Sequence, residues 1–211
     1  MEAGLMKWED QFVIKKVHQV GGSGKLKDVK PGTKMSLKQL TELMIIESDN
    51  TATEVLTEQV GLDAVTKRAK KFGMTKTVMW RRIWDFGAIT QGKDNFTTAR
   101  DLLTFFHKTY SCAEDNVLLP GFSRAGCKKM IDILKRQKNR KMIPRYLSPN
   151  IQIAHKTGEL TGVAGDAGIV YINGNPVILC FLANDTDNLQ AREGIARFTK
   201  MVIHYLQKGA K

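Results

Sequence analysis

Hydrophobic positions follow a helical period through most of the first 140 residues. Ser36 with Gln39 three positions later is a capping box, and the apolar stripe after it predicts a helix. Thr51 with Glu54 repeats this signature and predicts the start of a second helix. The helices predicted from these patterns cover 37–47, 52–60, 63–72, a segment that begins after Thr98, and 123–138.

In the last third of the chain the period changes to that of strands. Apolar residues alternate over 151–155, and apolar runs cover 167–172 and 177–183. Asn173-Gly174 lies between the last two runs and is typical of a tight antiparallel hairpin. The spacing of Ile195, Phe198, Val202 and Leu206 predicts a C-terminal helix that covers one face of the sheet.

These elements predict an α+β fold. We expect a helical domain over 20–148 and a sheet with its C-terminal helix over 149–211; residues 1–19 read as the end of a buried helix and a connecting segment. Residues 74–97 lack a clean period and predict a long ordered loop, which in a compact domain is usually functional.

Composition agrees with a folded soluble protein, because 42% of the 211 residues are apolar and 26% are charged. The net charge of +12 favours anionic partners, but the cations are spread along the chain. A nucleic-acid partner rests on this charge alone and is disfavoured. We expect no membrane span. The densest basic cluster is expected to lie on a solvated helix face and the loop that follows it: Lys135, Arg136, Lys138, Arg140, Lys141 and Arg145.

Cys112, Cys127 and Cys180 are odd in number and form no CxxC pair. The sequence therefore predicts buried thiols, and indicates neither a disulfide framework nor a zinc site. The four histidines have no ligand spacing, so no metal and no cofactor is expected.

Two short polar motifs occur in distinctive contexts. Ser48-Asp49-Asn50 lies at a turn between two predicted helices, and Lys156-Thr157-Gly158 lies at the end of a predicted strand. Together they resemble two motifs that flank the acyl-transfer cleft of penicillin-recognising serine enzymes, the class A β-lactamases and penicillin-binding proteins. The order of the motifs and the segment Asp94-Asn-Phe-Thr-Thr-Ala-Arg-Asp-Leu extend the resemblance over nearly the whole chain.

The resemblance implies a small β-lactam or a peptidoglycan-like peptide as substrate. On this basis Lys156 supplies a positive charge and Thr157 a hydroxyl to hold the substrate carboxylate. Gly158 lets the substrate lie against the strand, and the backbone N–H of Glu159 is one of the two oxyanion-hole donors.

The helix-turn motif carries the remaining implied roles. The Ser48 hydroxyl passes a proton towards the leaving nitrogen, Asn50 holds the amide side chain of the substrate, and Asp49 stabilises the turn. Class A enzymes also use a loop glutamate for deacylation, and Asp85 is the candidate for that role here. Asp94 is expected to anchor the loop against an arginine.

The sequence departs from the family in one respect, because none of its serines is followed by lysine at the third position. We expect a shortened form in which residues 1–19 are the remnant of the nucleophile helix and a connecting segment. The rest of that helix with its Ser-x-x-Lys, the outer strands of the sheet and a secretion signal would then precede Met1. Such a chain is expected to be inactive alone, and to self-associate or to accept a complementing N-terminal segment.

Three alternatives remain open from the sequence. They are a D-alanyl-D-alanine carboxypeptidase relative, a non-catalytic binder of β-lactams or peptidoglycan peptides, and a basic nucleic-acid binder. The location is unknown; the resemblance implies the periplasm or the outside of the cell if a longer precursor exists.

Overall fold

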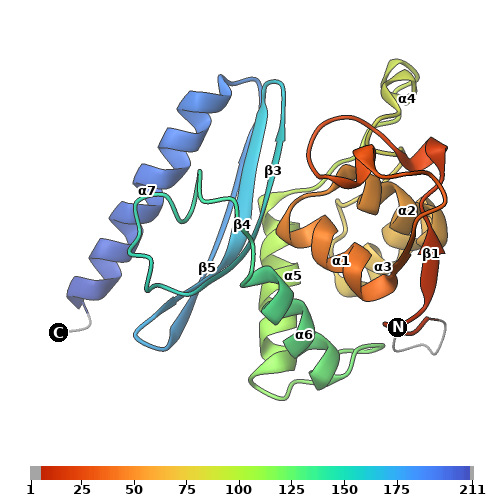
Figure 1. Ribbon diagram of the computed structural model, residues 1–211. Coiled ribbons are helices and arrows are strands. Elements are labelled where there is room, and N and C mark those ends of the chain that lie inside the picture. Colours follow the sequence, from red (N-terminus) through yellow and green to blue (C-terminus); the bar gives the residue numbers. More distant parts are fainter. Residues whose placement is uncertain (1–5, 210–211) are drawn as a thin grey trace.

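The computed structural model describes residues 6–209, so the part of the expected helix remnant at Met1–Leu5 lies outside the described residues. A three-stranded antiparallel sheet stands between the long C-terminal helix and the helical part of the chain (Figure 1). This is the predicted α+β arrangement. The helices are α1 (Leu37–Ile46), α2 (Asn50–Val60), α3 (Leu62–Phe72), α4 (Phe86–Thr90), α5 (Ala99–Ala113), α6 (Arg124–Leu134) and α7 (Asn188–Gly209).

Local capping signals place α1 correctly but not α2. The Ser36 hydroxyl accepts a hydrogen bond from Gln39 N at 3.2 Å, and the Gln39 side chain accepts one from Ser36 N, which confirms the capping box. The second predicted box is wrong, because Thr51 lies inside α2 and the cap is Asp49, whose Oδ1 accepts from Ala52 N at 2.9 Å. A carboxylate in this position is among the best N-caps, so α2 begins two residues earlier than predicted.

Two further segments differ from their predictions. Helix α6 ends at Leu134 and not near residue 138, because Gln137 and Lys138 are bound to the end of α1: Gln137 Nε2 donates to Ile45 O at 2.6 Å and Lys138 N to Ile46 O at 3.3 Å. The loop predicted over 74–97 contains the short helix α4.

A small two-stranded sheet lies outside the main one. It pairs β1 (Gln11–Val13) with β2 (Lys34–Ser36). A turn of 3₁₀ helix follows β1 from Lys16 to His18. Strand β2 has only three residues, which is too few to show a period in the sequence.

The main sheet has the strand order β3 (Ile153–Leu160), β4 (Val163–Ile172) and β5 (Asn175–Ala183). The predicted hairpin is confirmed, with positive φ angles of 51° at Asn173 and 83° at Gly174. Residues alternate between the faces, so that Ile153 packs with α7 and Ala154 packs with α5 and α6.

Strand β3 is an edge of this sheet, and one hydrogen bond shows which of its backbone groups are not used in pairing with β4. Tyr171 N donates to Gln152 O at 3.0 Å, which makes these two residues a hydrogen-bonded pair of the antiparallel ladder. Because such pairs alternate, the odd-numbered residues of β3 direct their N–H and C=O groups to the open edge. Thr157 and Glu159 belong to this set.

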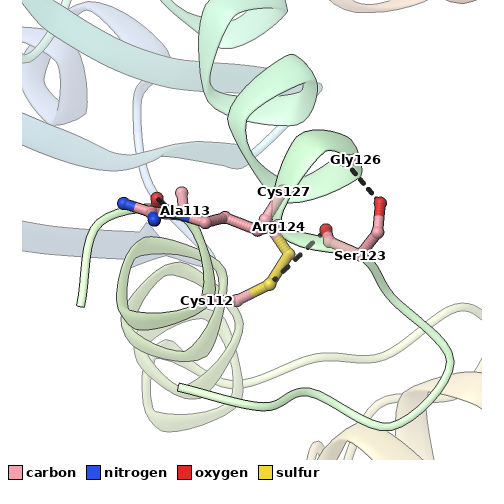
Figure 2. The surroundings of a disulfide bond; sticks show 6 residues. All are labelled: Cys112, Ala113, Ser123, Arg124, Gly126 and Cys127. Carbon is pink, nitrogen blue, oxygen red and sulfur yellow. Dashed lines mark hydrogen bonds between the residues drawn. A yellow bond between two sulfur atoms is a disulfide. The ribbon is translucent and has the colours of Figure 1, made fainter. Parts of the chain in front are cut away.

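A disulfide corrects the expectation of three thiols. Cys112 at the end of α5 is bonded to Cys127 in the first turn of α6, and both are buried (Figure 2). The spacing of 15 residues between these cysteines does not indicate a disulfide in the sequence, because they come together only when α5 and α6 pack against each other. Cys180 remains a thiol, and burial raises its pKa to about 11. No helix within residues 6–209 is long and apolar enough to cross a membrane.

Candidate functional site

The two motifs that are far apart in the sequence meet in the structure. Lys156 Nζ on β3 donates a hydrogen bond to Ser48 Oγ in the α1–α2 turn at 2.6 Å, and a second one to Thr157 O at 2.6 Å. The turn therefore lies against the open edge of β3, where Thr157 directs its carbonyl. This contact brings an ammonium group and a hydroxyl together between the helical part and the sheet.

Ser48 occupies its position through an unusual backbone conformation. Helix α1 ends at Ile46, and Ser48 has a φ angle of 55°, in the left-handed region that non-glycine residues adopt at a cost of order 1 kcal/mol. This reverses the chain so that α2 can begin at Asn50. The serine side chain is therefore presented from a sharp turn between two helices, outside the hydrogen-bonding pattern of both.

Asp49 holds the turn together, as expected. Its side chain is 0% exposed, and Oδ2 accepts from Lys25 N at 2.8 Å and from Leu26 N at 3.0 Å, while Oδ1 caps α2. Gly24 must be glycine for this approach, because a Cβ atom there would lie 2.3 Å from the Asp49 carboxyl carbon. The carboxylate thus joins the loop at residues 24–26 to the Ser48 turn.

Asn50 is also engaged with this loop. Its Nδ2 donates to Gly21 O at 2.9 Å, and its backbone N donates to Ser23 O at 3.1 Å. The side chain is partly exposed, so its amide oxygen can still meet a ligand.

Burial changes the protonation of Lys156. Loss of solvent around the ammonium group lowers its pKa to about 8, and the nearby Asp166 carboxylate opposes this by raising it. Asp166 is buried on β4, where Oδ1 lies 2.9 Å from His155 Nδ1 and Oδ2 accepts from Ile143 N at 3.0 Å. Lys156 is consequently mostly charged at neutral pH, but it loses its proton more easily than an exposed lysine.

The three residues after Lys156 differ in their surroundings. Thr157 is 5% exposed, and among the described residues its hydroxyl has no hydrogen-bond partner. A Cβ atom on Gly158 would meet nothing within 4 Å, so space is open in front of the strand. The Glu159 carboxylate is paired with Arg192 Nε on α7, while its backbone N–H faces the open edge of β3.

Asp85 does not join this group in the described structure. It is exposed and caps α4, with Oδ1 accepting from Ala88 N at 3.1 Å. Asp94 binds Arg81 Nε through Oδ1 at 2.6 Å, which confirms the expected arginine anchor. This ion pair therefore closes the part of the loop between residues 81 and 94, and Asp85 lies within that part.

Two buried groups that support the site were not identified from the sequence. Glu54 on α2 is 3% exposed and accepts from Arg82 Nη1 and Ile83 N, both at 3.1 Å, so it holds the loop against the helix. His155 and Asp166 pair behind Lys156. The only sequence signal for Glu54 was its place on the buried side of α2, and none existed for the His155–Asp166 pair. Within residues 6–209 no group of His, Cys, Asp and Glu could hold a metal ion.

A family model for the β-lactamase enzyme family matches residues 1–206. The chain belongs to this family. Among solved structures, the β-lactamase of Sphaerobacter thermophilus is 28% identical with a TM-score of 0.86, and the alignment covers 97% of this chain and 76% of that one. No curated protein sequence matches the chain.

Penicillin-binding protein PBP-A has the same fold. It is 24% identical with a TM-score of 0.85, over 98% of this chain and 75% of that one. A mutant of PBP-A, solved as an acyl-enzyme complex with penicillin G, gives a TM-score of 0.84 at 24% identity over the same shares of the two chains. The family inferred from the two motifs and the α+β fold inferred from the pattern of elements are therefore confirmed.

Proposed function

We propose that the site at Ser48 and Lys156 recognises β-lactams in the manner of a class A β-lactamase, as the substrate-holding part of an acyl-transfer site. The observation that carries this proposal is the 2.6 Å contact between Lys156 Nζ and Ser48 Oγ, because it joins two motifs that lie 108 residues apart in the sequence. Membership of the β-lactamase enzyme family supports the substrate class.

The roles of the strand residues follow from their surroundings. With a pKa of about 8, Lys156 is about nine-tenths protonated at pH 7, so it can bind the substrate carboxylate as an ammonium ion. The Thr157 hydroxyl has no partner in the described structure and completes this clamp. The open space in front of Gly158 admits the substrate, and the Glu159 N–H at the strand edge stabilises the developing oxyanion.

The turn residues act on the other side of the substrate. Ser48 relays a proton between Lys156 and the leaving nitrogen, and the free amide oxygen of Asn50 accepts from the amide side chain of the substrate. Asp85 remains the proposed deacylation carboxylate. That role requires its side chain to leave the Ala88 N–H that it now accepts from.

Recognition without turnover is the behaviour that we propose for the 211 residues alone. They contain no Ser-x-x-Lys, and removal of the nucleophile from a serine hydrolase costs about 10⁶ in turnover. The test is calorimetric titration with benzylpenicillin, with Lys156→Met as the binding-deficient variant and Lys67→Met on exposed α3 as the matched control. Equal affinity of all three proteins would refute the proposed site.

A non-catalytic binder of β-lactams or peptidoglycan peptides is the second candidate, and the absence of Ser-x-x-Lys favours it. A D-alanyl-D-alanine carboxypeptidase relative would use the same clamp on a peptide carboxylate. Titration with a D-alanyl-D-alanine peptide separates the two substrate classes, since binding of the peptide but not of penicillin would favour the carboxypeptidase reading.

The disulfide supports a location outside the cytosol. Disulfides persist in oxidising compartments such as the periplasm and are rare in the reducing cytosol. Cys112 and Cys127 are bonded here, so we propose a periplasmic or secreted location. Thiol labelling tests this in protein taken from cells and denatured without a reductant. If Cys112 and Cys127 are bonded in the cell, only Cys180 should be modified.

A face suited to self-association lies on the side of the sheet remote from Ser48. Strand β5 is the second edge of the sheet and carries no charged side chain. On α7, the exposed residues Phe198, Met201 and Tyr205 follow a helical spacing. We propose that two copies associate here. A monomer by light scattering at high protein concentration would contradict this.

A further inference from the structure

We propose that the loop around α4 inserts into the surface of an anionic phospholipid bilayer and attaches the protein to it. The inserted part consists of the exposed side chains of Trp84, Phe86 and Ile89, which we call the α4 tip. This inference is independent of the proposed function, because it uses a different surface and needs neither Ser48 nor Lys156.

The α4 tip is one continuous apolar patch. Trp84, Phe86 and Ile89 are 42%, 47% and 40% exposed, although all three come from one short segment. The rings of Trp84 and Phe86 meet edge to face, with their centroids 5.3 Å apart. Phe86 and Ile89 are three positions apart on α4 and are therefore neighbours on its surface. Single exposed apolar residues need no explanation, but a cluster of this kind indicates contact with a partner.

The shape of this part of the molecule fits a bilayer. Helix α4 has only five residues and projects from the helical part, above α2 (Figure 1). A stable interface with another protein buries about 800 Å² on each partner, which requires a broader surface than this narrow tip. A layer of lipid headgroups instead encloses a projecting tip from all sides. Phe86 and Ile89 also carry no polar side-chain atom, so contact with acyl chains leaves no hydrogen-bonding group unpaired.

The segment before the tip is fixed to the helical part. Arg81 Nη1 donates to Arg82 O at 3.1 Å and to Ile83 O at 3.0 Å. The buried carboxylate of Glu54 accepts from Arg82 Nη1 and from Ile83 N, both at 3.1 Å. The apolar side chains that follow are therefore held outward, and insertion requires little ordering of the loop.

Trp84 lies where the tip meets the loop at residues 21–28. A Cβ atom on Gly21 would lie 3.3 Å from Cη2 and from Cζ2 of Trp84, so the indole ring rests on this glycine. The exposed remainder of the ring faces away from that contact. Tryptophan is typical of the boundary between water and lipid, because its ring is largely apolar and carries one N–H donor.

Two lysines without a carboxylate partner flank the tip. Lys27 Nζ donates to Gly22 O at 3.0 Å, and a Cβ atom on Gly22 would lie 3.4 Å from the Trp84 ring. Lys93 N donates to Ala88 O at 3.0 Å, which brings this lysine back to α4. Both lysine side chains are exposed, and within residues 6–209 neither forms an ion pair.

The balance of charge around the tip favours an anionic surface. Asp94 is paired with Arg81, and Glu54 is paired with Arg82, so these groups add little net charge. Asp85 caps α4 and is the negative charge at the tip that has no ion pair within the described residues. The net charge of +12 adds long-range attraction to anionic lipid, and lysines at the level of the headgroups add a local one.

The experiment is sedimentation of the full chain with sucrose-loaded vesicles. One set contains phosphatidylcholine alone, and the other contains roughly one-third phosphatidylglycerol. We expect binding to the anionic vesicles to be at least about tenfold stronger than to the neutral ones and to weaken as salt is added. Brominated acyl chains should quench the fluorescence of Trp84. Trp84→Phe keeps an aromatic ring, so it should bind like wild type and lose most of this quenching.

A double variant tests insertion of the apolar side chains. Phe86→Ser with Ile89→Ser should weaken binding to anionic vesicles at least about tenfold, because both side chains then lose their transfer into lipid. Leu118→Ser is the matched control, since Leu118 is 95% exposed in the connection between α5 and α6. It should bind like wild type. Thermal melting verifies that each variant is folded.

A second pair of variants tests the two flanking lysines. Lys27→Gln with Lys93→Gln should weaken binding to anionic vesicles at least about fivefold at low salt and leave binding to neutral vesicles unchanged. Lys67→Gln with Lys70→Gln removes the same charge from exposed positions of α3 and should weaken binding less. Equal losses in the two double variants would overturn the placement of the lipid at the α4 tip.

Three other outcomes would overturn this inference. The first is equal binding of anionic vesicles by wild type and by Phe86→Ser with Ile89→Ser, which would show attraction by net charge alone. The second is no binding to either kind of vesicle. The third is dissociation of an oligomer in that double variant without vesicle binding, which would assign the tip to a contact between copies. Binding of benzylpenicillin is measured separately, so this inference and the proposed function can fail independently.

Discussion

Asp49 is the residue on which the shape of the site depends most, and its replacement gives a quantitative prediction. Asp49→Ala leaves three buried or partly buried backbone N–H groups without an acceptor: those of Lys25, Leu26 and Ala52. A hydrogen bond to a charged group contributes about 1.5–3 kcal/mol, and the three share one carboxylate and are not additive. We therefore expect the free energy of unfolding to fall by about 3–5 kcal/mol.

For a chain of this size that loss corresponds to a drop in Tm of roughly 10 °C, followed by circular dichroism, with urea unfolding to obtain the free energy. Asp49→Asn keeps one carbonyl oxygen and should lose about half as much. Asp85→Ala is the matched control, since that exposed carboxylate also caps a helix but accepts only one hydrogen bond; it should cost about 0.5–1 kcal/mol.

An equal fall in Tm for Asp49→Ala and Asp85→Ala would refute this prediction. Such a result would mean that the loop at residues 24–26 is not held by the carboxylate. In that case the position of Ser48 opposite Lys156 would need another explanation.

Three further predictions follow from the same structure. Hydrogen bonds to Lys15 and His18 lower the pKa of Glu58 to about 2. The contribution of this carboxylate to the stability of the fold is therefore complete above its ordinary pKa of 4.5 and is lost as the pH falls towards 2. In acid denaturation, Glu58→Gln should lose less stability than wild type over that range. Removing the disulfide with Cys112→Ser and Cys127→Ser should cost about 3 kcal/mol, the entropy of closing a 15-residue loop, and an unchanged urea midpoint would contradict this. The chain should not measurably hydrolyse a chromogenic cephalosporin, and turnover that disappears in Lys156→Met would prove this wrong.

The elements that the sequence predicted well are those set by neighbouring residues. The capping box at Ser36 and the Asn173-Gly174 hairpin depend on contacts within three or four positions, and both are confirmed. The cap of α2 was misassigned, because two good capping residues, Asp49 and Thr51, lie close together in the sequence. The loop at residues 24–26 binds the Asp49 carboxylate and thereby places Asp49 at the start of α2.

Contacts between distant segments could not be predicted from local patterns. The disulfide needs the packing of α5 on α6, and the buried Glu54 needs the loop at residues 82–83. The meeting of Ser48 and Lys156 was expected only because the two motifs resemble those of a known family. Asp85 was a choice by elimination among loop acids, and its function as a deacylation group stays a prediction.

The most direct test of the account is the affinity of benzylpenicillin for the folded chain, measured by calorimetry in wild type and in Lys156→Met, with Lys67→Met beside them. If Lys156 and Ser48 form one ligand site, wild type and Lys67→Met should bind at a single site, and Lys156→Met should bind at least about tenfold more weakly, since a charge-assisted hydrogen bond contributes about 1.5–3 kcal/mol. Identical binding by Lys156→Met, or heat of binding from none of the three proteins, would contradict the account.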